Sequence, residues 1–261
     1  MSDNLQQLGG HWAVVTGSSR GIGRAIALEL AAAGANVTIH AGSRGDLAAE
    51  VAAEATQMGV ATACVVSDLS TAHGRDALLA ATIGVRPISI WVNNAGVDVL
   101  TGPAADWSFA EKLQALWAVD VEATIMLSRA AGTAMRNADG GVILNMSWDQ
   151  AEAGMAGDSG EMFAAVKGAV AAFSRSLAKS LAPRVRVNCL APGWIRTAWG
   201  DDASDYWQSR AQRESLVGRW GEPRDVAQAA RFLASPAASF INGQVVAVNG
   251  GFAGHGDEPR T

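Results

Sequence analysis

Residues 12–24 read WAVVTGSSRGIGR, a short apolar run that leads directly into a glycine-rich turn and then into a helical pattern. Gly17, Gly21 and Gly23 allow a tight turn and a close approach of the backbone to a ligand. The start of the following helix offers free N–H groups and the positive end of the helix dipole. This stretch therefore predicts a cradle for the pyrophosphate group of a dinucleotide.

Short apolar runs alternate with longer amphipathic segments along the whole chain, which is typical of repeated βαβ units. The pattern predicts strands over Trp12–Thr16, Asn36–His40, Ala61–Val66, Ile88–Asn93, Gly141–Met146, Val185–Leu190 and Gln244–Val248. It predicts helices over Gly23–Ala33, Asp46–Met58, Gly74–Thr82, Phe109–Arg136, Glu161–Leu181 and Asp225–Leu233. We therefore expect an α/β fold: residues 1–261 as one Rossmann-type, doubly wound domain, with a seven-stranded parallel sheet covered by helices on both faces.

Two segments fall outside this pattern. Residues 194–217 contain no clean strand and are expected to form an irregular substrate lid over the carboxyl ends of the strands. Residues 254–261 are expected to be a flexible tail.

Charge and composition narrow the function classes. The formal net charge of −5 and the absence of a basic stripe argue against nucleic-acid binding. No apolar stretch is long enough to cross a bilayer and the N-terminal segment has no apolar signal region, so we expect a cytoplasmic protein without membrane contact. Cys64 and Cys189 lie in apolar runs and are expected to be reduced core thiols, and the four histidines lack metal-ligand spacing, so no metal site is predicted.

The end of the second predicted strand bears on the choice of dinucleotide. A fold that selects NAD usually places an acidic residue there, but residues 40–44 read His-Ala-Gly-Ser-Arg. Arg20 and Arg44 could instead hold a 2′-phosphate, which favours NADP(H) over NAD(H). The alternative interpretation is two solvated surface arginines.

Several motifs together resemble the classical short-chain dehydrogenase/reductase family. They are the T-G-x-x-x-G-x-G form of residues 16–23, Asn93-Asn94-Ala95-Gly96, Asp68-Leu69, the stretch from Pro192 to Thr197, Asn242-Gly243-Gln244 and Gly250-Gly251. Residues 218–226 look like the 3-oxoacyl-carrier-protein reductase branch. The resemblance spans nearly the whole chain and implies a carbonyl or alcohol substrate and a homotetramer, with a heteromeric assembly as the alternative.

The resemblance also implies which residues contact the cofactor. These are Gly17, Ser19, Arg20, Gly21, Ile22, Gly23, Ser43, Arg44, Asp68, Leu69, Asn94, Ala95, Gly96, Lys167, Pro192, Gly193, Ile195 and Thr197.

The catalytic positions depart from the family pattern. The family uses an Asn, a Ser, and a Tyr and Lys spaced Y-x-x-x-K, in which the Tyr donates a proton and the Ser hydrogen-bonds the carbonyl oxygen. Here Phe163 precedes Lys167 in that spacing, Trp148 aligns with the serine, and Asp120 aligns with the asparagine. Ser147 lies one residue early and could replace the serine only through a backbone bulge.

Three functions remain open on this basis. The first is an NADP(H)-dependent oxidoreductase of 3-oxoacyl reductase type whose proton donor has moved, with candidates Asp120, Ser147, Asp149, Glu152, Asp158, Glu161 and Lys167. Against it, these acids can be loop residues or can cap the following helix. The second is a cofactor-binding pseudoenzyme or non-catalytic partner subunit. The third is a non-redox enzyme in which Phe163 and Trp148 line an apolar substrate pocket.

Overall fold

The core of the structure is one parallel sheet. A computed structural model describes residues 7–201 and 203–252, so the predicted tail at 254–261 lies outside the described residues. The strands are β1 Trp12–Val15, β2 Asn36–Ala41, β3 Thr62–Val66, β4 Ile88–Asn93, β5 Gly141–Met146, β6 Val185–Pro192 and β7 Val245–Val248. Their order is β3-β2-β1-β4-β5-β6-β7, and every pairing is parallel. The predicted fold class is therefore confirmed.

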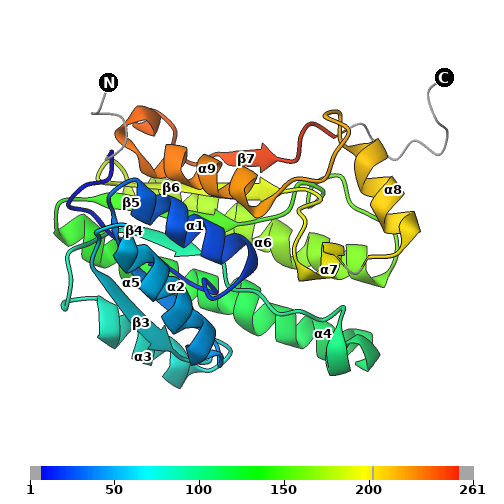
Figure 1. The fold of residues 1–261 in the computed structure, drawn as a ribbon, viewed down its shortest axis with the longest axis horizontal. Coiled ribbons are helices and arrows are strands. Elements are labelled where there is room, and N and C mark those ends of the chain that lie inside the picture. The colour runs from blue at the N-terminus through cyan, green and yellow to red at the C-terminus, as the bar shows by residue number, and fades with distance from the viewer. Residues whose placement is uncertain (1–6, 202, 253–261) are drawn as a thin grey trace.

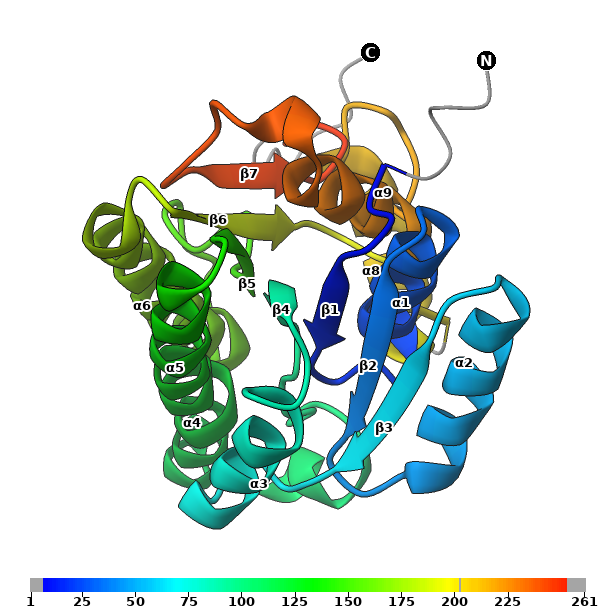
Figure 2. The ribbon, with the colours of Figure 1, turned by 90° about the vertical axis from the view of Figure 1, so that its left-hand side faces the viewer.

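Helices cover both faces of this sheet. They are α1 Gly21–Ala32, α2 Gly45–Gln57, α3 Ala72–Thr82, α4 Phe109–Leu116, η2 Trp117–Ala123, α5 Thr124–Asn137, α6 Asp158–Leu181, α7 Ala198–Asp201, α8 Asp205–Glu214 and α9 Pro223–Ala234, with short η1 Gly102–Asp106 and η3 Pro236–Ala238. Figure 2 shows α1, α2 and α9 on one face and α4, α5 and α6 on the other. The strands point toward the end of the molecule where α7 and α8 lie (Figure 1).

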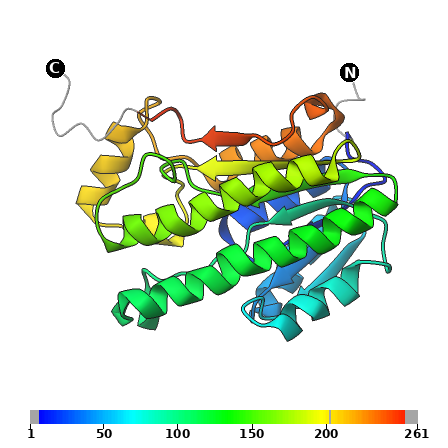
Figure 3. The ribbon, with the colours of Figure 1, turned by 180° about the vertical axis from the view of Figure 1, so that it is seen from behind.

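The long predicted helix 109–136 has a different interior from the one expected. It runs as a continuous rod (Figure 3), but Trp117–Ala123 form a π-helix between α4 and α5. The wider turn carries Asp120, whose buried carboxylate accepts a hydrogen bond from the Val97 backbone, 3.1 Å away. The apolar periodicity of the sequence does not distinguish this i→i+5 hydrogen bonding from that of an α-helix.

Residues 194–217 are not irregular, which corrects the prediction. They contain helices α7 and α8, and only the placement over the carboxyl ends of the strands agrees with the expectation. Helix α8 is mostly polar and buries only Ala211 and Glu214. A helix that buries so little shows almost no apolar periodicity, so the sequence pattern hid it.

The prediction for Cys64 was wrong. This thiol is exposed, whereas Cys189 is buried, and both are free. Cys64 lies on β3, an edge strand of the sheet, so one side of its strand faces outward. Burial raises the pKa of the Cys189 thiol to about 11.

A buried chain of polar side chains fixes the sheet to the helices behind it. Asn93 on β4 donates to Asn145 on β5 and to Ser128 on α5, at 2.8 Å each. Asn145 in turn donates to Ser174 on α6, at 2.8 Å. These residues are almost fully inaccessible to solvent, so each depends on the others for its hydrogen bonds. The network thereby sets the position of α6 relative to the sheet.

Replacing Asn145 with Ala should lower the free energy of unfolding by about 2–4 kcal/mol, because Asn93 and Ser174 then lose buried partners. Urea unfolding followed by circular dichroism measures the change. Asn137→Ala, at the exposed end of α5, is the control and should change stability by about 0.5 kcal/mol or less. A loss of under about 1 kcal/mol for Asn145→Ala would show that the network carries little of the stability.

Candidate active site

The carboxyl ends of β1 and β4 meet at the point where the strand order reverses, which is where open α/β sheets bind ligands. The Thr16 hydroxyl accepts hydrogen bonds from the backbone of Asn94 and Ala95, at 2.9 and 3.0 Å. A Cβ atom on Gly17 would lie 2.8 Å from the Ala95 Cα atom, and one on Gly23 would lie 2.3 Å from the Asn94 Nδ2 atom. Both glycines are therefore required by packing between the two strand ends.

The start of α1 fits a phosphate group. Arg20 occupies the N-cap position, and no side chain among the described residues caps the helix there. Gly21 has a φ of +57°, a conformation that favours glycine. The first N–H groups of α1 and the positive end of its dipole thus face the crevice, so the residues present fit the pyrophosphate of a dinucleotide.

His40, at the end of β2, holds the glycine loop in place. Its Nδ1 atom accepts a hydrogen bond from the Gly17 N–H at 3.1 Å, and its Nε2 atom lies 3.0 Å from the Ser67 carbonyl oxygen. This pattern requires the neutral ring with its proton on Nε2. Burial lowers the pKa of His40 to about 4, and the bond to Ser67 offsets only part of that shift. No sequence motif marks this role; the position of a histidine on a buried strand is the one signal for it.

The remaining predicted cofactor residues follow the carboxyl ends of the strands. Arg20, Ser43, Arg44, Asp68 and Gly96 are exposed at this edge. The other predicted contacts lie on the same loops or line the cavity described below; they are Ser19, Ile22, Leu69, Pro192, Gly193, Ile195 and Thr197. Arg44 is bound to Asp46, with 2.6 Å between Nη2 and Oδ2, so contact with a 2′-phosphate would require it to share or leave that carboxylate.

Lys167 and Asp120 form an ion pair on the other side of the crevice. Lys167 lies on α6 and Asp120 on η2, with 2.7 Å between Nζ and Oδ1 and side-chain exposures of 14% and 3%. The second oxygen of Asp120 accepts the Val97 N–H, and the Lys167 ammonium lies 3.4 Å from the Met146 carbonyl oxygen. The structure therefore brings two of the three predicted catalytic residues into direct contact.

The third predicted catalytic residue, Ser147, is differently engaged. Its hydroxyl donates to the Lys167 carbonyl oxygen at 3.0 Å. The register between β5 and β6 is regular through Met146, and the Ser147 N–H continues the pattern with a bond to Leu190. The structure thus shows no bulge that would move this hydroxyl, and its proton is committed to the backbone.

The other candidate proton donors lie outside the cavity described below. Glu152 pairs with Arg175 at 2.6 Å on an exposed surface. Asp158 and Glu161 lie in the first turn of α6, where their charges favour the helix dipole, but Gly157 is the N-cap, so neither residue is the cap that the alternative expected. Asp149 accepts a hydrogen bond from Asn249 at 3.0 Å, and burial raises the pKa of its carboxyl group.

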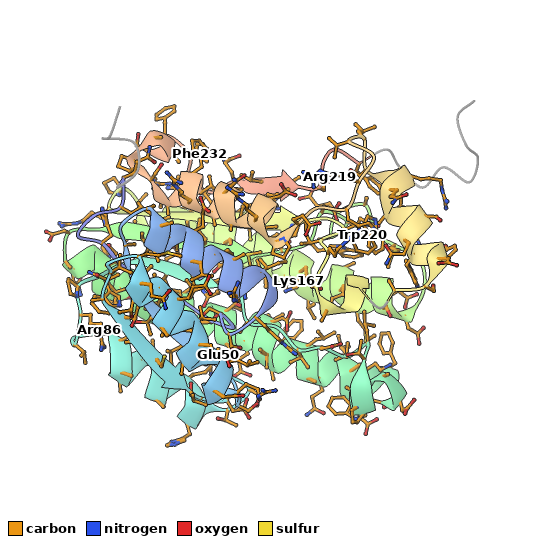
Figure 4. The ribbon with its side chains drawn as sticks, viewed as in Figure 1. Glu50, Arg86, Lys167, Arg219, Trp220 and Phe232 are labelled. Carbon is orange, nitrogen blue, oxygen red and sulfur yellow. The ribbon has the colours of Figure 1, made fainter. Side chains whose placement is uncertain are left out.

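An apolar cavity of about 580 Å³ opens beside Lys167. Trp148 and Phe163 line it and meet edge to face, with 6.3 Å between ring centroids, so Trp148 forms a wall and does not fill the space. The cavity also reaches Asn94, from the cradle side, and Trp220. Figure 4 places Lys167 and Trp220 on the side of the molecule toward which the strands run, and Arg86 at the opposite end.

A family model described as Enoyl-(Acyl carrier protein) reductase matches residues 17–253. The chain belongs to the classical short-chain dehydrogenase/reductase family. It is 36% identical to a 3-oxoacyl-(acyl-carrier-protein) reductase of Aquifex aeolicus, over 94% of this chain and 98% of that protein. It is 35% identical to galactitol 2-dehydrogenase (L-tagatose-forming) of Cereibacter sphaeroides, over 94% and 96% of the two chains.

Solved structures of other family members agree with the fold. A 7α-hydroxysteroid dehydrogenase in complex with NADH and 7-oxo glycochenodeoxycholic acid matches with a TM-score of 0.86 and 31% identity, covering 97% of both chains. A 3-oxoacyl-(acyl-carrier-protein) reductase of Agrobacterium tumefaciens with bound NADP matches with a TM-score of 0.85 and 29% identity, covering 96% of this chain and 97% of that one. This short-chain dehydrogenase/reductase thus shares the architecture in which its relatives bind nicotinamide dinucleotides.

Two kinds of feature are not found in the parts of the chain that the structure describes. Within residues 7–201 and 203–252, no group of three or more His, Cys, Asp or Glu side chains is placed to hold a metal ion. Over the same residues, every helix is too short or too polar to traverse a bilayer.

Acidification should destabilise the protein through His40. Because the folded-state pKa of His40, about 4, lies below its ordinary value of 6.5, the unfolded chain takes up a proton first. The contribution of His40 to the free energy of unfolding is complete above pH 6.5 and is lost as the pH falls to 4. The loss is about 1.4 kcal/mol per pH unit and about 3 kcal/mol in total. His40→Gln should flatten this part of the stability curve, measured by urea unfolding between pH 4 and 7.

The control for this experiment is His73→Gln, since His73 is exposed on α3. That variant should keep the slope of the parent protein. Equal slopes for the parent and His40→Gln would contradict the assignment of His40 as a buried neutral side chain.

The Lys167–Asp120 pair should show the signature of a buried ion pair. Asp120→Leu or Lys167→Met alone should cost about 3–5 kcal/mol in unfolding free energy, because each leaves a buried charge without its partner. The double variant should cost less than either single one. Glu152→Ala and Arg175→Ala form the matched cycle on an exposed pair, with an expected coupling of at most about 1 kcal/mol. Additive losses at Lys167 and Asp120 would refute the coupling.

Proposed function

We propose that this protein is an NADP(H)-dependent oxidoreductase that interconverts a carbonyl compound and an alcohol, with Lys167 in place of the usual tyrosine as proton donor. The observation that carries the proposal is the Lys167–Asp120 pair at 2.7 Å beside an apolar cavity that also reaches Asn94 of the dinucleotide cradle. In this ion pair the ammonium group is the donor and the carboxylate the acceptor.

Each residue of the site has a distinct part in this mechanism. The Lys167 ammonium lines the cavity, where it can hydrogen-bond a carbonyl oxygen and transfer a proton to it. Asp120 acts as a positioning residue, since it holds the ammonium and is itself fixed by the Val97 N–H. When bound, a nicotinamide dinucleotide supplies the hydride that the carbonyl carbon receives, and alcohol oxidation reverses both transfers.

The proposed preference for NADP(H) rests on Arg20 and Arg44. Both side chains are exposed: Arg44 follows β2, and Arg20 lies in the glycine loop that His40 holds. No residue from His40 to Arg44 is acidic. Guanidinium groups match the geometry of a 2′-phosphate. Relatives have been solved with NADP, as in the Agrobacterium tumefaciens enzyme, and with NADH, as in the 7α-hydroxysteroid dehydrogenase.

A second candidate is a cofactor-binding pseudoenzyme or non-catalytic partner subunit. Two specific observations favour it. Phe163, at the position that matches the family tyrosine, has no acidic proton, and the Ser147 hydroxyl is donated to the backbone of α6. On this alternative the cradle binds a dinucleotide, and the Lys167–Asp120 pair contributes only to structure.

Titration with NADPH and NADH, followed by quenching of tryptophan fluorescence, tests the first part of the proposal. We expect NADPH to bind more tightly than NADH. Arg20→Ala or Arg44→Ala should lower the affinity for NADPH by about tenfold or more and change the affinity for NADH little, because only NADPH carries the extra phosphate. Equal losses for both dinucleotides would reject the proposed selectivity. Binding of neither dinucleotide would reject the cradle itself.

Turnover then separates the two candidates. An oxidoreductase should consume NADPH with some member of a ketone and aldehyde panel, and Lys167→Met should reduce kcat by about 10²-fold or more when the variant is saturated with NADPH. The pH profile of kcat should also differ between the parent enzyme and the Asp120→Asn variant. Tight NADPH binding without turnover, together with reductase activity gained by the Phe163→Tyr, Trp148→Ser double variant, would establish the pseudoenzyme.

A further inference from the structure

The cavity beside Lys167 is walled by aromatic rings from five separate segments of the chain. Four of the nine tryptophans line it, together with Phe163. Trp148 follows β5, Trp194 follows β6, Trp207 lies on α8 and Trp220 precedes α9. No strand or helix brings these rings together by local spacing, so the cluster is a product of the tertiary fold.

The rings on the α8 side are held rigidly. Trp194 contacts Trp207 and Trp220, with ring centroids 5.5 and 6.1 Å apart. The Trp194 indole N–H donates to the buried Glu214 carboxylate at 2.8 Å. Arg210 binds the other oxygen of Glu214 at 2.7 Å and lies over the rings of Trp194 and Trp207.

The charges of that assembly are kept away from the cavity. Among the described residues that line it there is no carboxylate or guanidinium group; Glu214 and Arg210 lie behind the aromatic wall. Three of the polar lining residues are engaged within the protein: Asn94 donates to the Thr16 and Gly17 carbonyls, Ser147 donates to the Lys167 carbonyl, and Lys167 pairs with Asp120.

This inventory argues against a polyhydroxylated substrate. Apart from Ser159 and Thr197, the side chains that line the cavity leave few partners for a sugar, so most of its hydroxyl groups would leave water without gaining a hydrogen bond, which disfavours binding. A flat ring, by contrast, can exchange water for stacking and edge-to-face contacts with rigid indole rings, at little cost in conformational freedom. The residues that line the cavity therefore favour substrates that are flat and aromatic.

From this geometry we infer that the substrate is a ketone, or the matching alcohol, carried on a flat fused-ring aromatic system, with the carbonyl oxygen toward Lys167. This inference rests on the proposed oxidoreductase function for its reactive group. The choice of ring system rests independently on the cavity wall. The cavity of about 580 Å³ is also lined by predicted cofactor contacts such as Asn94, Gly193 and Thr197, so the dinucleotide and the substrate would share it and the substrate would take the part beside the tryptophans.

Binding to the NADP⁺-saturated protein tests the inference without turnover. Isothermal titration calorimetry would compare 2-tetralone, its saturated bicyclic counterpart 2-decalone, and D-fructose. We expect 2-tetralone to bind about 2- to 12-fold more tightly than 2-decalone, the range expected for aromatic contacts beyond simple burial. D-Fructose should show no binding. If 2-decalone or D-fructose binds as tightly as 2-tetralone, the inference is overturned.

Matched tryptophan variants locate the binding site. Trp207→Leu and Trp148→Leu each remove a ring from the cavity but keep an apolar side chain. Each should lower the affinity for 2-tetralone by about 2- to 12-fold. Trp107→Leu is the control, because Trp107 is 42% exposed and does not line the cavity. Variants are compared only where their circular dichroism matches that of the parent. Unchanged 2-tetralone affinity in both cavity variants would refute the aromatic wall as the binding surface.

Failure of the inference and failure of the proposed function give different results. Turnover of D-fructose or of open-chain ketones without binding of 2-tetralone would support the oxidoreductase and overturn the ring-system inference. Binding of 2-tetralone without any NADPH consumption would support the aromatic site and reject the catalytic proposal. If no dinucleotide binds, the same titration on the free protein still decides the ring-system inference.

Discussion

The contact between the ends of β1 and β4 is the constraint on which the candidate site depends. Gly17 lies against Ala95 so closely that any side chain on Gly17 would collide with the backbone, and Thr16 ties the two segments through its hydroxyl. The strand order reverses between β1 and β4, so a crevice lies at their carboxyl ends. The start of α1 faces this crevice. The cradle and the cavity therefore share Asn94 as a common boundary.

The site combines one buried ion pair with an otherwise apolar wall, and the two features reinforce each other. An ion pair in such surroundings interacts more strongly than it would in water, which keeps Lys167 fixed against Asp120. Most of the side chains that line the cavity are apolar or aromatic, so a carbonyl oxygen that enters would meet few donors besides that ammonium group. Among the described lining residues, Lys167 is the one charged donor, which gives the site a preferred direction for that oxygen.

Local patterns in the sequence were enough to predict the sheet, because each strand is a short apolar run bounded by turn residues. They also placed Lys167 and Asp120 in the correct elements. The π-helix around Asp120, helix α8 and the exposure of Cys64 could not be predicted, since each depends on what lies beside the segment in space. The same limit applies to the aromatic cavity, whose tryptophans come from distant parts of the chain.

The role of His40 has a consequence for the free-energy cost of binding a ligand in the cradle. The neutral imidazole accepts the Gly17 N–H, and the Ser18 hydroxyl accepts the His40 N–H at 3.0 Å, so hydrogen bonds within the protein hold the loop. A loop that is held in this way loses little further conformational freedom when a ligand binds, so less of the interaction free energy is spent on ordering it.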